Sequence, residues 1–102
     1  ENDWENTMAR LTESEIATLL PEVSGWVIVE EEDMKRLRRT FNFDDFGEAL
    51  NFTVRVGAVA ETEDHHPRIT TEWGRVTVTW WSHDQGGIVA ADFEMAKRVD
   101  DL

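Results

Sequence analysis

The chain lacks the side chains on which much covalent and metal chemistry depends. Its 102 residues include no cysteine, no tyrosine and only two prolines. Without cysteine there can be no disulfide framework and no zinc site with thiolate ligands. Histidine is then the side chain best suited to proton transfer near neutral pH, because its ordinary pKa is about 6.5.

Positive charge is also scarce. Ten Lys and Arg residues stand against 22 Asp and Glu residues, which gives a net charge of −12. Such a field repels phosphate backbones and anionic lipids, so we expect no direct nucleic-acid partner and no membrane association. No apolar run reaches the roughly 18 residues of a membrane span, and the first residues do not resemble a signal peptide. We therefore expect a cytoplasmic protein.

The length and composition predict one globular domain. Hydrophobic residues make up 40% of the chain, an ordinary share for a soluble domain of this size. Residues 1–10 are polar apart from isolated side chains such as Trp4, and we expect this segment to be loosely ordered. The domain itself should comprise residues 11–102.

The first half of the chain predicts a helix followed by a strand hairpin. Thr12 and Glu15 have the spacing of a capping box, and the apolar residues that follow share one helical face. Residues 26–29 are apolar and mostly β-branched, which favours a strand. An acidic turn at 30–33 would lead into a second strand, whose β character is clearest at residues 40–43.

The second half predicts a long helix, a second pair of strands and a last helix. Asp44 or Asp45 can cap the long helix, which is apolar around more than half of its circumference. We expect such a helix to be mostly buried across a sheet. Residues 68–73 and 75–82 are rich in β-branched and aromatic side chains and predict strands, and residues 92–99 predict a helix.

The order of these elements predicts the fold class. It is α-β-β-α-β-β-α, an α+β single domain in which helices pack on one face of a four-stranded antiparallel sheet. The end of the long helix and the end of the last strand can then meet at one cleft.

All three histidines fall near those two ends, within nineteen residues. His65 and His66 lie in the run Glu61-Thr62-Glu63-Asp64-His65-His66-Pro67, and His83 follows the last strand. Glu61 is four residues before His65, so its carboxylate can orient that ring and raise its pKa. A helix-end pair and a strand-end histidine form a plausible general acid and general base.

Other interpretations of these residues exist. The histidines can be ordinary surface residues, or three imidazoles can hold a zinc ion for hydrolysis. Adjacent histidines are poor helical ligands compared with a pair four residues apart, so we rank metal binding below acid–base use. Among the tryptophans, Trp80 is expected in the core, whereas Trp81 lies on the strand face shared with His83 and could stack on a flat ring.

The motif Asp64-His65-His66-Pro67, with Glu61 before it and His83 after it, resembles the signature of the pterin-4a-carbinolamine dehydratases. The resemblance runs from about Leu11 to the C-terminus. The stretch 71–83 is especially similar to bacterial members associated with phenylalanine hydroxylase. Further matching positions are Gly25-Trp26, Phe43-x-Asp45-Phe46, Arg55 and Gly87.

The resemblance implies the same fold and a reaction. A 4a-hydroxytetrahydropterin loses water and becomes a quinonoid dihydropterin, with no metal and no organic cofactor. This would recycle pterin for an aromatic amino-acid hydroxylase such as phenylalanine hydroxylase. It also implies a homodimer or homotetramer.

The resemblance also assigns roles. His65 and His83 would be the acid–base pair, and His66 would bind the pterin beside them. The other residues implied to bind substrate or orient the histidines are Glu61, Asp64, Pro67, Trp81 and Asp92.

The chain departs from the commoner family pattern at three places. Arg68-Ile69 stands where many members have Glu-Trp, and Ala91 stands where an arginine often precedes the final acid. Val89 replaces a serine or threonine that caps the last helix, a loss of about 1 kcal/mol unless another group substitutes.

A non-catalytic role is the alternative. Relatives of this fold serve as a dimerisation cofactor for a transcription factor or resemble Rubisco assembly factors. A pure binding module need not keep acid–base residues, and this chain has Glu61, Asp64 and all three histidines. We therefore favour the enzyme.

Overall fold

The structure is a computed structural model that describes residues 9–102. Its elements confirm the predicted order and the α+β class. Two short 3₁₀ helices, η1 (Leu20–Val23) and η2 (His83–Gln85), accompany them. The main elements are α2 (Glu13–Leu19), β1 (Val27–Glu31), β2 (Met34–Asn42), α3 (Phe46–Glu63), β3 (Arg68–Glu72), β4 (Arg75–Trp80) and α4 (Ala90–Asp100).

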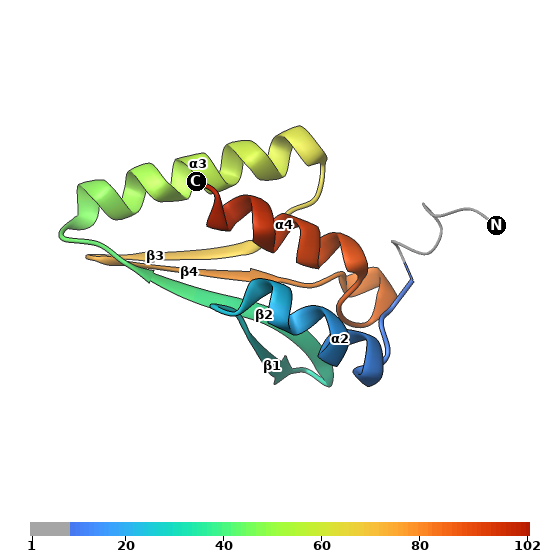
Figure 1. Cartoon of the computed structure of the whole chain (residues 1–102). Coiled ribbons are helices and arrows are strands. Elements are labelled where there is room, and N and C mark those ends of the chain that lie inside the picture. The colour runs from blue at the N-terminus through green and yellow to red at the C-terminus, as the bar shows by residue number, and fades with distance from the viewer. Residues whose placement is uncertain (1–8) are drawn as a thin grey trace.

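The four strands form one antiparallel sheet in the order β1-β2-β4-β3. Leu37 of β2 lies opposite Trp80 of β4, and Ile69 of β3 lies opposite Val78. Figure 1 shows α3 and α4 side by side on one face of this sheet, α3 against β3 and β4 and α4 against β2 and β4. The C-terminal ends of α3 and β4 consequently lie at the same end of the domain, as predicted.

The first helix begins at the predicted capping box. The Thr12 hydroxyl accepts a hydrogen bond from the Glu15 backbone N–H at 3.1 Å, and the Glu15 carboxylate accepts one from Thr12 N–H at 2.9 Å. Two of the donors that a helix start leaves unpaired are satisfied in this way.

The β1–β2 hairpin is longer than the sequence indicated. Glu32 and Asp33 both adopt positive φ, 54° and 61°, and make a two-residue turn, so that Met34 pairs directly with Glu31. Strand β2 therefore begins at Met34. Its early part was hard to recognise because arginines occupy positions 36 and 38 on the face turned away from the helices.

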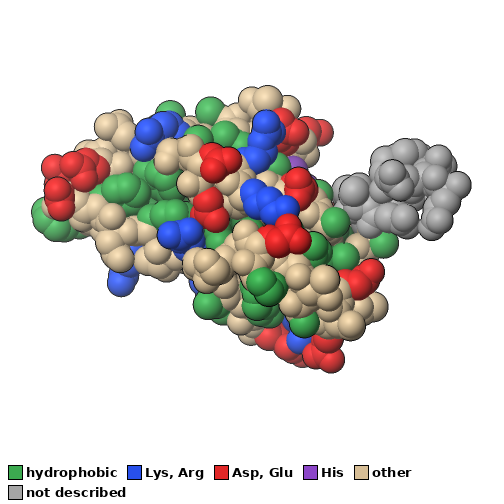
Figure 2. Space-filling model, in the orientation of Figure 1, with side chains coloured by type: hydrophobic (Ala, Val, Ile, Leu, Met, Phe, Trp, Pro, Cys, Tyr) green, Lys and Arg blue, Asp and Glu red, His purple; other side chains and the backbone are tan. Residues whose placement is uncertain are grey.

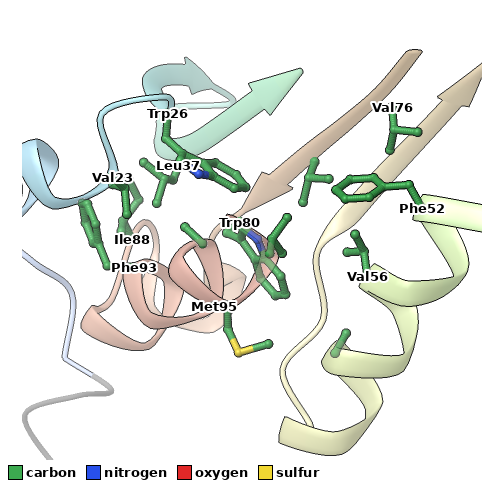
Figure 3. Packing of buried hydrophobic residues seen from close by; sticks show 14 of the residues in the cluster. Val23, Trp26, Leu37, Phe52, Val56, Val76, Trp80, Ile88, Phe93 and Met95 are labelled. Atoms are coloured by element: carbon green, nitrogen blue, oxygen red, sulfur yellow. The ribbon is translucent and has the colours of Figure 1, made fainter. Parts of the chain in front are cut away.

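The core lies between the sheet and the helices and centres on Trp80, which is fully buried as predicted. Figure 3 shows two packed groups, one of Phe52, Val56 and Val76 beneath α3 and one beside α4. The second group includes Val23, Trp26, Leu37, Ile88 and Phe93. Within it, the indole N–H of Trp26 donates to the Asp100 carboxylate at 2.9 Å, which fastens the end of α4 to the residue that precedes β1.

The long helix α3 differs from expectation in one respect. Asp45 caps it by accepting from Glu48 N–H at 2.8 Å, and one face is buried through Ala49, Phe52, Val56 and Ala60. The expectation that it is mostly buried is wrong for a single chain, because the sheet covers only one side of a helix. Large apolar side chains remain exposed on the other side: Phe46 (45%), Leu50 (46%) and Val54 (63%).

The predicted boundary at residue 10 falls mainly on residues outside those described. Within the described part, Arg10 forms an isolated β-bridge with Val89, and Leu11 N–H donates to the Ile88 carbonyl at 2.9 Å. Across residues 9–102, no helix combines the length and hydropathy that crossing a membrane requires.

Candidate active site

The end of α3 turns the chain sharply so that the two adjacent histidines point differently. Asp64 ends the helix in the left-handed conformation, with φ of 52°, which aspartate tolerates better than most residues. The His65 backbone N–H then donates back to the Ala60 carbonyl at 3.1 Å. As a result the His65 side chain is largely buried, whereas His66 is about half exposed.

His83 is presented by a short closed loop after β4. Ser82 N–H donates to the Gly87 carbonyl at 2.8 Å, and Gly87 N–H donates back to the Ser82 carbonyl at 3.3 Å. The enclosed residues form η2, and Gly86 completes the loop with a φ of 79°, a conformation that favours glycine. The loop holds His83 at the surface beside the end of α3.

A surface hollow of about 330 Å³ brings the histidines together. This size falls in the lower part of the range of small-molecule sites. A histidine is visible in purple near the end of α3 in the space-filling view (Figure 2). The residues that line the hollow are Asp64, His65, His66, Trp81, Ser82, His83, Asp84 and Gln85.

His65 is held by a carboxylate that is distant in sequence. Its Nε2 lies 2.5 Å from Asp92 Oδ1, and its ring stacks on Trp80 with centroids 5.6 Å apart and planes inclined by 12°. The hydrogen bond to Asp92 raises the pKa of His65 above 6.5, and the negative charge of Asp92 adds to this, while partial burial opposes it. Asp92 therefore favours the imidazolium form of His65 relative to an ordinary histidine.

Asp92 has two further partners. It is fully buried, and its Oδ2 accepts from Val89 N–H at 2.9 Å and from the Ser82 hydroxyl at 3.3 Å. The bond to Val89 N–H is the half of a capping box that the third helical residue supplies, and it ties the start of α4 to Asp92 although Val89 has no side-chain oxygen to supply the other half. One carboxylate therefore joins the start of α4, the strand-end loop and the His65 ring.

His66 pairs with Glu61 instead. Its Nε2 lies 2.5 Å from Glu61 Oε2, and both side chains are exposed. The sequence had paired Glu61 with His65, four residues on, and this pairing was wrong. Helical spacing no longer applies there because α3 ends at Glu63 and the left-handed Asp64 redirects the chain.

The remaining predicted residues divide by position. Asp64 and Trp81 line the hollow, whereas Asp92 lies beneath His65 and Pro67 leads into β3 without being among the lining residues. Ala91 borders a second hollow between α3 and α4 that shares Asp64 and His65 with the first. The departure at Ala91 therefore lies on the far side of His65 from His83.

Sequence reasoning missed several residues. Ser82, Asp84 and Gln85 line the hollow, and Arg36 places its guanidinium 4.0 Å from the centroid of the Trp81 ring. The cap function of Asp92 was detectable, since it follows Val89 at the three-residue capping distance. The contact of Arg36 with Trp81 depends on pairing between β2 and β4, which the sequence does not reveal.

A metal centre is not formed by these side chains. Among residues 9–102, no three His, Asp or Glu residues are placed to hold one metal ion. The geometry instead offers one partly buried imidazole supported by a carboxylate and two exposed imidazoles around a hollow. Such a set can donate and accept protons on a single bound molecule.

Comparison with known proteins places this site in a family context. The profile of the family described as pterin 4 alpha carbinolamine dehydratase matches residues 9–102. A relative from Chlorobium limicola is 58% identical over 92 residues, which cover 90% of this chain and 81% of the relative. A relative from Nitrosococcus oceani is 52% identical over 93 residues, covering 91% and 82%. Both are assigned by name to the pterin-4-alpha-carbinolamine dehydratases.

Two solved structures share the fold. A transcriptional coactivator/pterin dehydratase from Brucella melitensis superposes with a TM-score of 0.79 at 34% identity, over 90% of this chain and 96% of that one. A pterin dehydratase-like protein described as a RuBisCO assembly factor of the alpha-carboxysome gives a TM-score of 0.62 at 23% identity, over 76% and 87%. The second likeness concerns the fold alone.

Proposed function

Because the chain belongs to the pterin-4a-carbinolamine dehydratase family, we propose that it is a hydro-lyase acting at the histidine hollow. The reaction converts a 4a-hydroxytetrahydropterin into quinonoid dihydropterin and water. One observation carries the proposal: three imidazoles line one hollow, and a buried carboxylate supports one of them.

The chemistry requires two proton transfers. The bond between C4a and the hydroxyl oxygen breaks with its electron pair on oxygen, and a donated proton lets the group leave as water. The proton on N5 is removed, and its electron pair forms the N5=C4a double bond. The net change is loss of one water molecule, without oxidant or reductant.

The environments of the histidines suit these tasks. We assign His65 as the general acid, because the hydrogen bond to Asp92 raises its pKa and so favours the protonated form that a general acid needs. His83 lines the same hollow from the opposite chain segment and is the candidate base for the N5 proton. His66, oriented by Glu61, supplies a binding contact to the ring.

The other side chains contribute binding and positioning. Asp64 and Trp81 line the hollow and are proposed to contact the pterin, together with Pro67 at its margin. Asp92 acts through His65, because it is fully buried and its oxygens are occupied by His65, Ser82 and Val89.

The proposal extends to the cellular location, the associated hydroxylase and the oligomeric state of the enzyme. We place the enzyme in the cytoplasm, recycling pterin for an aromatic amino-acid hydroxylase such as phenylalanine hydroxylase, as a homodimer or homotetramer. The resemblance of residues 71–83 to hydroxylase-associated members supports the link, and the exposed apolar face of α3 supports self-association.

A non-catalytic assembly role is the rival function. Its support is the fold shared with the RuBisCO assembly factor. That likeness, at 23% identity, shows the fold alone, whereas the histidine hollow with its buried Asp92 is what acid–base chemistry requires. We therefore retain the dehydratase as the conclusion.

Stopped-flow dehydration of a 4a-carbinolamine pterin tests the function. The wild type should accelerate the reaction, and His65→Ala and His83→Ala should each lower kcat by about 10²–10⁴-fold, the range for a lost general acid or base. Arg75→Ala is the control, because Arg75 pairs with Glu72 at the opposite end of β4 and should leave the rate unchanged. Wild-type rates in both histidine variants would overturn the assignment.

A further inference from the structure

Arg36 is buried in an unexpected place. It alternates along β2 with Leu37, which faces the helices, so its side chain lies on the face of the sheet that the helices do not cover. It is nevertheless only 1% exposed. Arginine is rarely buried to this degree unless other groups pair with it and cover it.

The cover is the indole of Trp81. The guanidinium carbon of Arg36 lies 4.0 Å from the centroid of that ring, a close cation–π stack. Trp81 follows Trp80, the partner of Leu37, so in the register of β2 and β4 it falls opposite Arg36. The stack is thus set by strand pairing.

Residues at the β1–β2 turn hold the Arg36 guanidinium in place. Its Nη2 donates to the Glu31 carbonyl at 3.1 Å and to the Glu32 carboxylate at 3.0 Å, and Nη1 lies 3.4 Å from a Glu31 carboxylate oxygen. Arg68, two residues beyond His66, also places its guanidinium carbon 5.4 Å from the Trp81 centroid. Trp81 is therefore contacted by guanidinium groups from two strands, β2 and β3, and the β1–β2 turn holds the first of them in place.

The stack of Arg36 on Trp81 is less favourable for stability than an apolar contact of the same size would be. Within the described residues, the buried Nε of Arg36 and the buried Nε1 of Trp81 have no hydrogen-bond partner. Leaving a buried donor unpaired is unfavourable, and an apolar pair of similar volume would fill the position without that penalty. The position of Trp81 supplies the missing reason, because it lines the histidine hollow and Arg36 does not.

We propose that Arg36 is a positioning residue that fixes the Trp81 indole as a wall of the histidine hollow, and thereby sets its affinity for a flat heteroaromatic substrate. This rests on the proposed dehydratase function. Arg36 touches no reacting atom, and Trp81 is not a proton-transfer group. Loss of the wall weakens ground-state and transition-state binding alike, so KM rises while kcat is preserved.

The test compares matched arginine variants. Arg36→Lys keeps the charge but removes the planar group, and we expect KM to rise by about tenfold with kcat within about twofold of wild type. Arg38→Lys is the control: it lies two residues along the same strand face and also bonds Glu31, at 2.9 Å, yet has no stack on Trp81. It should leave both constants unchanged within about twofold.

A double-variant cycle asks whether Arg36 acts through Trp81. Trp81→Leu should itself raise KM, and adding Arg36→Lys in that background should raise it no further. If Arg36→Lys left KM unchanged and only lowered the melting temperature, its role would be structural and the proposal would be overturned. A full KM effect that persisted without Trp81 would overturn it as well.

A substrate-free measurement separates this proposal from the proposed function. The near-UV circular dichroism difference between wild type and Trp81→Phe isolates the Trp81 signal. Arg36→Lys should lose that signal and Arg38→Lys should keep it. If the wild type were inactive, the dehydratase function would be refuted, and the circular dichroism result would still decide whether Arg36 orders Trp81. If Arg36→Lys kept the Trp81 signal, the positioning role would be refuted even in an active enzyme.

Discussion

His65 obtains its environment from residues that lie far from it in the chain. Asp92, 27 positions away, binds its ring, and Trp80 stacks beneath it. The sequence correctly indicated which histidines share a hollow, because chain order places them at the ends of α3 and β4. It assigned the nearest acid, Glu61, to the wrong histidine, since a single left-handed residue, Asp64, ended the helical spacing on which that assignment relied.

The Asp92 contact should appear in the pH dependence of catalysis. Since Asp92 raises the pKa of His65, replacing it by Asn should lower that pKa, leaving burial to depress it further. If His65 is the general acid, activity falls as pH rises through its pKa, and the alkaline limb of kcat/KM should move to lower pH in Asp92→Asn. Glu61→Gln is the control, because Glu61 pairs with His66 and its loss should leave the alkaline limb where it is. If Asp92→Asn also left the alkaline limb unmoved, Asp92 would not be the group that sets the pKa of His65.

The same contact predicts a pH-dependent contribution to stability. The pKa of His65 is raised on folding above the unfolded value near 6.5, so protonation favours the folded state. The contribution is complete below about pH 6.5 and is lost as pH rises through the folded-state pKa. The free energy of unfolding of wild type minus that of His65→Gln should therefore decrease from pH 5.5 to pH 8.5 in urea titrations. A difference that grows with pH would contradict this.

At the scale of elements, the helix starts could be predicted because they depend on residues close together in the sequence. Features that depend on contacts between distant segments could not be predicted. The capping box at Thr12 and Glu15 and the cap at Asp45 were recognisable because each needs residues three apart. The start of β2 was missed because its pairing with β1 depends on a turn of two non-glycine residues with positive φ. The exposed face of α3 was missed because an apolar pattern does not say how many neighbours cover a helix.

The loop that presents His83 depends on Gly86. Its φ of 79° is strained for any residue with a Cβ, so Gly86→Ala should destabilise the fold by about 1 kcal/mol and lower kcat by displacing His83. The control is Gly57→Ala in α3, where a Cβ would meet no atom within 4 Å. That variant should stabilise the protein by up to about 1 kcal/mol with unchanged kcat. Thermal unfolding and the stopped-flow assay measure both, and equal effects of the two substitutions would argue against the loop's role.

At the scale of the whole molecule, two features affect self-association in opposite ways. The net charge of −12 makes copies of the chain repel one another, whereas the apolar face of α3 favours their association. Figure 2 shows acidic and basic side chains intermixed over the face formed by α3 and α4, so the excess negative charge is not concentrated there. The exposed face of α3 repeats an apolar residue every four positions, at Phe46, Leu50 and Val54. Such a stripe can be buried against a second copy by ridge-and-groove helix packing.

We therefore expect the protein to self-associate through α3. Light scattering after size exclusion should give a mass above that of one 11.8-kDa chain. Leu50→Glu combined with Val54→Glu should lower it to the monomer mass, because each carboxylate would be desolvated in an apolar contact. Ala17→Glu, which adds charge to the exposed side of α2, is the control and should leave the mass unchanged. Because the three histidines of the hollow come from the same chain, the monomeric variant should keep kcat. A monomeric wild type would show that the stripe serves another purpose.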